Sequence, residues 1–160
     1  MPPPLMTMLE KLIAAPSVSS INPQWDQSNK AVIELLSGWL ETLGFRVEIL
    51  EIPGCPDKWN LLASAGKGPD GLLLSGHTDT VPYDDRRWLS DPFRLSEREQ
   101  RLYGLGSSDM KSFFALVIEA VRELDLSRLR QPLMILATAD EESTMCGAQS
   151  LLETNRHLGR

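Results

Sequence analysis

The sequence predicts an α/β protein, specifically a three-layer α/β/α sandwich with a mixed β-sheet. Strand-like and helix-like segments alternate along the 160 residues, as is typical of helices packed on both faces of a sheet. Two apolar segments, 72–74 and 131–139, are each followed directly by a loop that carries histidine or carboxylate side chains. Reactive groups gather where the strands of open α/β sheets end. The sequence therefore also predicts a functional site at one edge of the sheet.

The first three predicted elements are two helices and a strand. Helical spacing of apolar side chains predicts a helix over residues 5–14, which Pro16 ends, and a second helix over residues 29–43. Residues 45–52 then alternate between apolar and polar side chains. This alternation predicts a half-exposed strand near a sheet edge.

Two further strands and a long loop follow. We expect strands over residues 60–64 and 72–75, separated by a glycine-rich turn. Because the three leucines at 72–74 leave no polar face, the second of these is predicted to be a central strand, buried on both faces. The loop over residues 79–95 either borders a substrate cleft or is an ordinary solvated loop with charged side chains.

The chain continues with a helix, a strand and a short helix. Residues 109–124 have an apolar stripe at helical spacing that includes Phe114 and Val117. Residues 131–139 form an apolar run expected to be a buried strand, and residues 148–158 are typical of a short helix. With the segments before them, these elements complete the predicted sandwich.

Composition restricts the classes of partner. The formal net charge of −6 argues against a nucleic-acid partner, because phosphate binding needs a basic face. No apolar run approaches the length of a membrane span, so no membrane partner is expected. Cys55 and Cys146 form no CxxC pair and no signal peptide precedes them. They are expected to be free thiols of a cytoplasmic protein.

His77 and Asp79 form a His-x-Asp pair directly after the strand expected over residues 72–75. Such a pair is typical of an imidazole that ligates a metal while a carboxylate accepts the other ring N–H and fixes the tautomer. The alternative is a polar loop with a surface histidine. The pair by itself leaves both interpretations open.

Two further loops carry candidate groups. The consecutive carboxylates Asp140, Glu141 and Glu142 follow the strand expected over residues 131–139. Their mutual repulsion would be relieved by a bound cation, although a solvated acidic turn is the alternative. The glycine-bearing loop at 103–111 does not have the spacing of a nucleotide-binding loop, and its Ser or Asp could be an ordinary helix N-cap.

Together, four motifs resemble those of the co-catalytic zinc amidohydrolases and metallopeptidases, a family that includes aminoacylase, carboxypeptidase G and succinyl-diaminopimelate desuccinylase. The motifs are Gly-His-Thr-Asp-Thr-Val-Pro at 76–82, Leu-Tyr-Gly-Leu-Gly at 102–106, Asp-Met-Lys at 109–111 and Ile-Leu-Ala-Thr-Ala-Asp-Glu-Glu at 135–142. The resemblance implies a zinc-exopeptidase-like fold and a cis peptide bond between Asp109 and Met110. It is strongest to members that hydrolyse the amide bond of N-acetyl-L-ornithine to ornithine and acetate.

The resemblance also implies roles for individual residues. His77 corresponds to a ligand of the first metal, Glu142 to a ligand of the second, and Asp109 to the carboxylate that bridges both. Glu141 corresponds to the general base, and Asp79 to the residue that orients His77. The implied cofactor is a pair of Zn²⁺ ions in each complete site, with Co²⁺ as an alternative. A metal-bound water would attack the amide of a small N-acyl amino acid.

The same resemblance implies that residues 1–160 are only the N-terminal part of the catalytic domain, because family members take one more carboxylate and one more histidine ligand from later in the chain. The dimerisation domain would also be absent, and full-length members are expected to be homodimers. His157 does not match the spacing of the family ligand and is expected to be a surface residue. The alternatives are a sister amidohydrolase acting on another N-acyl amino acid or dipeptide, and an inactive fragment with a scaffold or binding role only.

Overall fold

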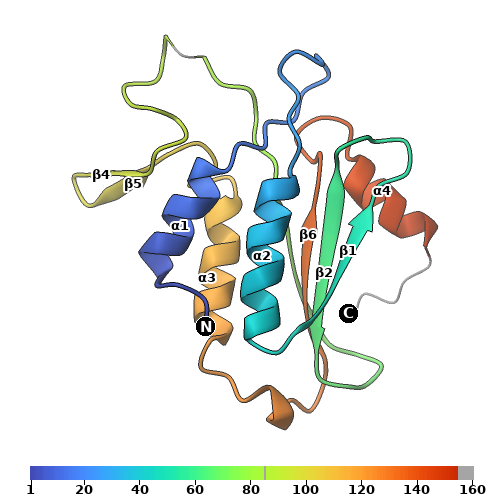
Figure 1. The fold of residues 1–160 in the computed structure, drawn as a ribbon. Coiled ribbons are helices and arrows are strands. Elements are labelled where there is room, and N and C mark those ends of the chain that lie inside the picture. The colour runs from blue at the N-terminus through green and yellow to red at the C-terminus, as the bar shows by residue number, and fades with distance from the viewer. Residues whose placement is uncertain (85, 155–160) are drawn as a thin grey trace.

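The computed structural model describes residues 1–84 and 86–154, which form a four-stranded sheet with helices on both faces and a separate two-stranded hairpin (Figure 1). The helices are α1 (Leu5–Ala14), α2 (Lys30–Thr42), α3 (Lys111–Val121) and α4 (Cys146–Glu153), with a short 3-10 helix η1 (Leu126–Arg128). The strands are β1 (Arg46–Glu51), β2 (Trp59–Ala65), β3 (Leu72–His77), β4 (Ser96–Arg98), β5 (Arg101–Tyr103) and β6 (Leu133–Thr138).

The larger sheet is mixed, as the sequence predicts. Its strand order is β1-β2-β6-β3, in which β2 is antiparallel to both β1 and β6, whereas β3 runs parallel to β6. The register places Leu74 beside Ile135 and His77 beside Thr138. Because β3 and β6 are parallel neighbours, their carboxyl ends lie at the same edge of the sheet.

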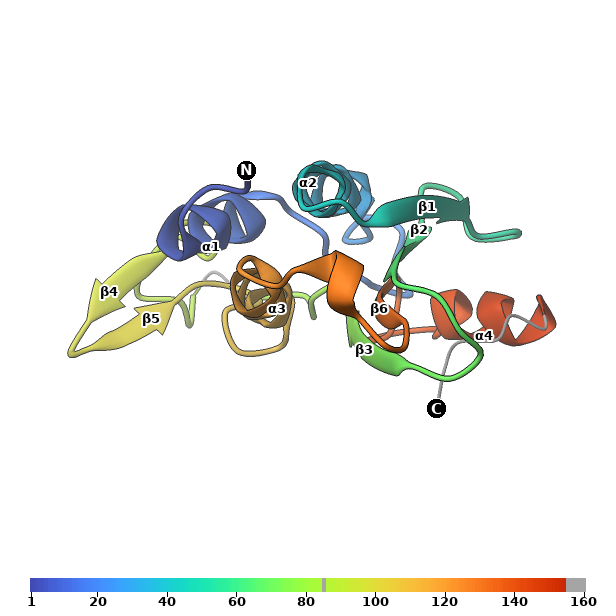
Figure 2. The same ribbon diagram turned by 90° about the horizontal axis from the view of Figure 1, so that it is seen from below.

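Helices cover the sheet on two sides, which confirms the three-layer arrangement (Figure 2). The alternating side chains of β6 explain this: Ile135 packs into the large core formed with α1, α2 and α3, while Leu136 packs into a smaller cluster with Leu151 of α4. Successive residues of a strand point to opposite faces, so β6 contributes to both clusters. All six residues of β6 are buried.

In the sheet formed by the described residues, strand β3 lies at an edge, whereas the sequence predicted a central strand. Its leucines do reach both faces, since Leu74 packs against the large core and Leu73 against the smaller cluster. Leu72, however, is 57% exposed. An apolar run indicates that both faces of a strand are packed against other residues. The position of the strand in the sheet depends instead on backbone pairing with distant segments.

The hairpin of β4 and β5 was not predicted. Its turn residues Glu99 and Gln100 both have positive φ, at 50° and 60°. Hairpin turns of this kind usually carry Gly, Asn or Asp at such positions, so the local sequence gave no turn signal. The final predicted helix is observed as α4, but the predicted end at 158 and His157 lie outside the described residues. None of the described helices has the length and apolar content needed to cross a membrane.

Candidate metal centre

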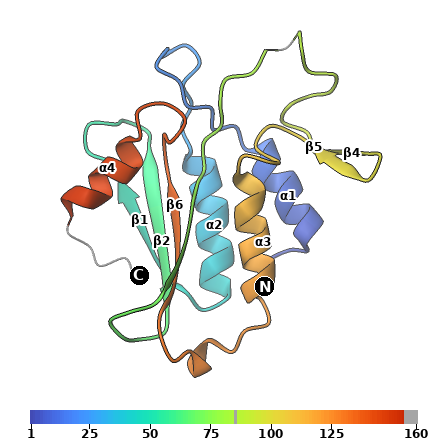
Figure 3. The ribbon, with the colours of Figure 1, turned by 180° about the vertical axis from the view of Figure 1, so that it is seen from behind.

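Three loops bring the predicted site residues together at the carboxyl edge of β3 and β6. His77 is the last residue of β3, and Glu141 and Glu142 lie in the loop that follows β6. Asp109 lies in the loop that leads into α3. Figure 3 shows the end of β6 and the beginning of α3 at the same end of the molecule.

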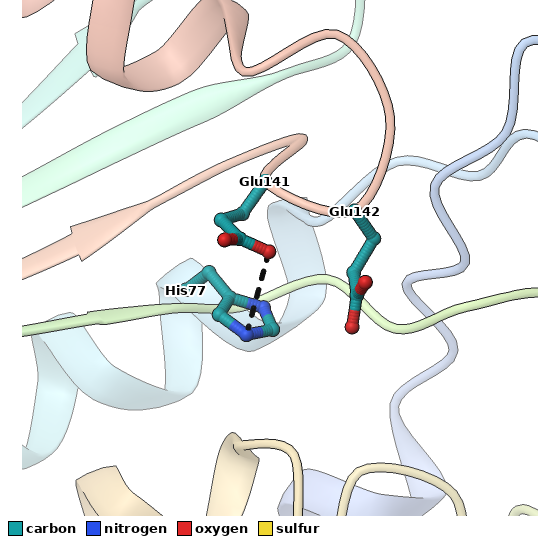
Figure 4. Close-up of side chains that lie close together, drawn as sticks. All are labelled: His77, Glu141 and Glu142. Carbon is teal, nitrogen blue, oxygen red and sulfur yellow. Dashed lines mark ion pairs between the residues drawn. The ribbon is translucent and has the colours of Figure 1, made fainter.

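The side chains of these loops approach one another closely. Nε2 of His77 lies 3.1 Å from Oδ1 of Asp109 and 3.9 Å from Oε2 of Glu141. One donor atom each of His77, Glu141 and Glu142 lie within 4.8 Å of one another (Figure 4). His77 is buried, Glu142 is half-buried, and Glu141 and Asp109 are exposed. One ring nitrogen and three carboxylates therefore face a common space.

Asp79 is buried beneath this site and contacts two of its loops. Nδ1 of His77 lies 3.1 Å from the Asp79 carbonyl oxygen and 3.6 Å from Oδ1 of the carboxylate. The other carboxylate oxygen, Oδ2, accepts a hydrogen bond of 3.0 Å from the backbone N–H of Glu142. Asp79 therefore restrains the His77 ring and the acidic loop at the same time, with Nε2 of the ring left facing the carboxylates.

The approach of Asp109 depends on a glycine at the end of β3. A Cβ on Gly76 would lie 2.8 Å from Cε of Met110 and 2.9 Å from Cδ1 of Phe113. A larger residue at this position would require both side chains to shift, so glycine lets the beginning of α3 pack directly on the strand that carries His77. The Asp109–Met110 peptide bond is cis, as the family resemblance implies. Neither Ser108 nor Asp109 caps the helix, since no side-chain hydrogen bond caps the N-terminus of α3.

Lys111, the first residue of α3, is fully buried. Its Nζ donates hydrogen bonds of 3.2 Å and 2.7 Å to the carbonyl oxygens of Leu12 and Ala15 at the C-terminal end of α1. Burial lowers the pKa of this ammonium to about 8, against the opposing effect of Asp79. A cation bound to terminal helix carbonyls is a favourable pairing, and here it anchors the loop of Asp109 to α1.

The charges of the site favour a bound cation. Burial raises the pKa of Glu142, and the negative charges of Asp109 and Glu141 raise it further, against the opposing effect of His77. Burial of the imidazole lowers the pKa of His77, but Asp79, Asp109 and Glu141 more than offset this and raise the pKa to about 9. The carboxylates thus repel one another and attract positive charge, a balance that a divalent cation satisfies.

The donor set fits a transition metal. One imidazole nitrogen with several carboxylate oxygens suits zinc and neighbouring divalent ions. By distance alone, Glu141 belongs with His77 and Glu142 as a group that could hold an ion. The family resemblance instead gives Glu141 a proton-transfer role and places Asp109 between two ions. These two assignments make different predictions for crystals that contain the metal.

The sequence analysis missed the buried polar side chains that support two of these loops, the loop of His77 and the loop that follows β6 and carries residues 140–142 (the acidic loop). Oδ1 of Asn60 accepts a hydrogen bond of 3.1 Å from the backbone N–H of Ala139, next to the acidic loop. Nδ2 of Asn29 donates one of 2.8 Å to Oγ1 of Thr78, next to His77. Asparagine is depleted in strands, so Asn60 within a predicted strand was a usable signal. Lys58, also buried, gave none.

With this fold and this site, the chain belongs to the peptidase family M20/M25/M40, whose family model matches residues 73–160. It is 57% identical over 151 residues to an acetylornithine deacetylase of Pasteurella multocida and 53% identical over 152 residues to an acetylornithine deacetylase of Salmonella paratyphi B. These alignments cover 94% and 95% of this chain. The chain spans only about 40% of the length of these curated relatives.

Solved structures support the fold. Human carnosine dipeptidase 1 matches 94% of this chain with a TM-score of 0.75 at 24% identity, over 34% of its own length. A metallo-carboxypeptidase of the M20 family from Sulfolobus solfataricus matches 88% of this chain with a TM-score of 0.72 at 22% identity, over 31% of its own length. Both likenesses confirm the α/β architecture, a mixed sheet with helices on both faces.

Proposed function

We propose that this chain is the N-terminal part of the catalytic domain of a metal-dependent amidohydrolase that converts N-acetyl-L-ornithine to ornithine and acetate. The observation that carries the proposal is the convergence of His77, Asp109, Glu141 and Glu142 at one sheet edge. It occurs in a chain that is 57% identical to an acetylornithine deacetylase. The reaction belongs to arginine biosynthesis, so the cytoplasm is the proposed compartment.

The proposed division of roles follows the family resemblance. His77 would hold one ion through Nε2, Glu142 would hold a second, and Asp109 would lie between them. When bound, such ions act as Lewis acids that polarise an amide carbonyl and lower the pKa of water. The exposed carboxylate of Glu141 accepts a proton from the attacking water and returns it to the departing amine nitrogen. Asp79 keeps the His77 ring in place.

We propose Zn²⁺ as the metal, two ions in each complete site, with Co²⁺ as an alternative. The mixed nitrogen and oxygen donor set supports both ions. The substrate is a small N-acyl amino acid, and the full-length protein is proposed to be a homodimer. These finer assignments rest on the likeness to acetylornithine deacetylases rather than on any residue that reads the ornithine side chain.

The test is turnover by the full-length polypeptide that contains this chain. Metal is removed with a chelator, and ornithine release from N-acetyl-L-ornithine is measured before and after zinc or cobalt is returned. The expected result is activity that disappears with the metal and recovers with it. Faster metal-dependent cleavage of another N-acyl amino acid or of a dipeptide would identify a sister amidohydrolase instead. Absence of cleavage of every amide substrate would overturn the proposal.

A further inference from the structure

Asp140 differs sharply from the two carboxylates that follow it. It is only 5% exposed, whereas Glu141 is exposed and Glu142 is half-buried. Its φ of 62° lies in the left-handed region, which Asp tolerates better than most residues. Three consecutive acidic residues therefore do not share one environment.

Both carboxylate oxygens of Asp140 already have protein partners. Oδ1 accepts a hydrogen bond from Oγ of Ser19 and lies 3.5 Å from Nζ of Lys58. Oδ2 accepts hydrogen bonds from the backbone N–H of Thr144, at 3.2 Å, and from the Thr144 hydroxyl. With both oxygens engaged in this way, Asp140 is not available as a metal ligand.

These partners connect the acidic loop to the segments beside it. Nζ of the buried Lys58 also donates hydrogen bonds of 2.7 Å to Oδ1 of Asp26 and 2.8 Å to the Gln27 carbonyl oxygen. The backbone N–H of Ser19 donates one of 2.9 Å to the carbonyl oxygen of Thr80, directly after Asp79. Asp140 thus lies where the acidic loop, the loop after α1 and the loop of His77 meet.

The backbone of Asp140 closes the same turn. Its carbonyl oxygen accepts a hydrogen bond of 2.7 Å from the N–H of Met145, while its carboxylate holds Thr144. Glu141 and Glu142 lie within the turn that these hydrogen bonds close, between Asp140 and Thr144. We propose that Asp140 is a positioning residue that holds the acidic loop in the turn presenting Glu141 and Glu142 toward His77. Its link to metal binding rests on the proposed function.

The variant that tests this is Asp140→Asn in the full-length polypeptide. Asparagine keeps the size and tolerates the left-handed conformation, but it replaces one acceptor oxygen with a donor that faces Ser19 or Thr144. The matched control is Asp57→Asn, the same change at an exposed position with a φ of 61°. Both variants lose one negative charge in the same backbone conformation, so a general charge effect appears in both.

Two measurements are made. The first is hydrogen exchange at the amides of Glu142 and Met145 without metal, because their acceptors, Oδ2 of Asp79 and the Asp140 carbonyl, survive the substitution. The second is zinc affinity by competition with a chelating dye. For Asp140→Asn we expect exchange at least about tenfold faster and zinc binding about 10–100-fold weaker, the usual cost of losing a residue that supports metal ligands. Asp57→Asn should change neither.

Each outcome decides the matter. A folded Asp140→Asn protein with wild-type exchange and wild-type zinc affinity overturns the proposal, even if its melting temperature falls. If Asp140→Asn does not fold, Thr144→Val, which removes one hydroxyl donor to Asp140, takes its place with the same expected directions. If the wild-type protein binds no zinc, the proposed function fails, and the metal-free exchange alone decides whether Asp140 holds the loop.

Discussion

Gly147 offers the clearest test of how the acidic loop is supported. It is the second residue of α4 and is buried against the end of β6. A Cβ at this position would lie 2.4 Å from the carbonyl oxygen of Ala139 and 2.7 Å from both its backbone nitrogen and Oδ1 of Asn60. Backbone atoms cannot rotate away as the end of a flexible side chain can, so Gly147→Ala must push α4 away from β6.

The expected cost follows from these contacts. Overpacking of a filled interior costs about 1–3 kcal/mol. Asn60 also donates a hydrogen bond of 2.8 Å to the Gly147 carbonyl oxygen and accepts one of 3.1 Å from the Ala139 N–H. Losing one or both of these hydrogen bonds costs about 0.5–1.5 kcal/mol each. Together these terms amount to about 1.5–6 kcal/mol. For a chain of this size that corresponds to a fall in Tm of roughly 3–24 °C.

The assay is thermal unfolding of the 160-residue chain followed by circular dichroism, with Gly38→Ala as the control. Gly38 is an exposed residue within α2, and a Cβ there meets nothing within 4 Å. Alanine in a helix interior is more stable than glycine by about 0.5–1 kcal/mol. Gly38→Ala should therefore raise the Tm, whereas Gly147→Ala should lower it. A Gly147→Ala protein that melts at or above the wild-type temperature would refute the reasoning.

Three further predictions concern the site and the thiols. In the full-length polypeptide, Glu141→Gln should retain metal but lose about 10²–10⁴ in kcat, whereas His77→Ala should lose metal. Elemental analysis and turnover measurements on both variants distinguish the two effects. Equal metal loss in both variants would contradict the assignment of Glu141 as the base and His77 as a ligand. Burial and the adjacent Cys55 raise the pKa of Cys146 to about 12. Iodoacetamide at pH 8 should therefore label Cys55 far faster than Cys146, as measured by peptide mass spectrometry. Equal labelling of the two cysteines would contradict this. The 160-residue chain alone should bind zinc weakly in calorimetry and release no ornithine. The proposed roles give each metal only two ligands among the described residues, whereas catalytic zinc sites use three protein ligands. Tight binding of two zinc ions would contradict this.

The sequence was sufficient for the four helices, for the strands of the larger sheet, and for placing the candidate site residues at the ends of two of those strands. β6 is predictable because its continuous apolar run contributes side chains to the hydrophobic clusters on both faces of the sheet. His77 and the pair Glu141–Glu142 could be placed together because each follows an apolar strand, and ends of neighbouring parallel strands meet at one edge. The half-exposed pattern of β1 likewise gave its edge position correctly.

The remaining features depend on contacts between distant segments. Lys111 can be buried because the carbonyl oxygens of Leu12 and Ala15, 99 and 96 residues earlier, accept hydrogen bonds from its ammonium group. No local pattern encodes that, since lysine is ordinarily exposed. The edge position of β3 has the same origin, because leucines 72–74 say nothing about which strand pairs with them. Asp140 was grouped with its acidic neighbours because composition alone does not separate them.

The central claim is that His77, Asp109 and Glu142 hold a pair of metal ions while Glu141 remains free to transfer protons. Anomalous diffraction at the zinc edge from crystals of the full-length polypeptide tests it most directly. The account predicts two peaks, one at Nε2 of His77 and one at the Glu142 carboxylate, with Asp109 between them and Glu141 bound to neither. A single peak ligated by His77, Glu141 and Glu142 together would contradict it.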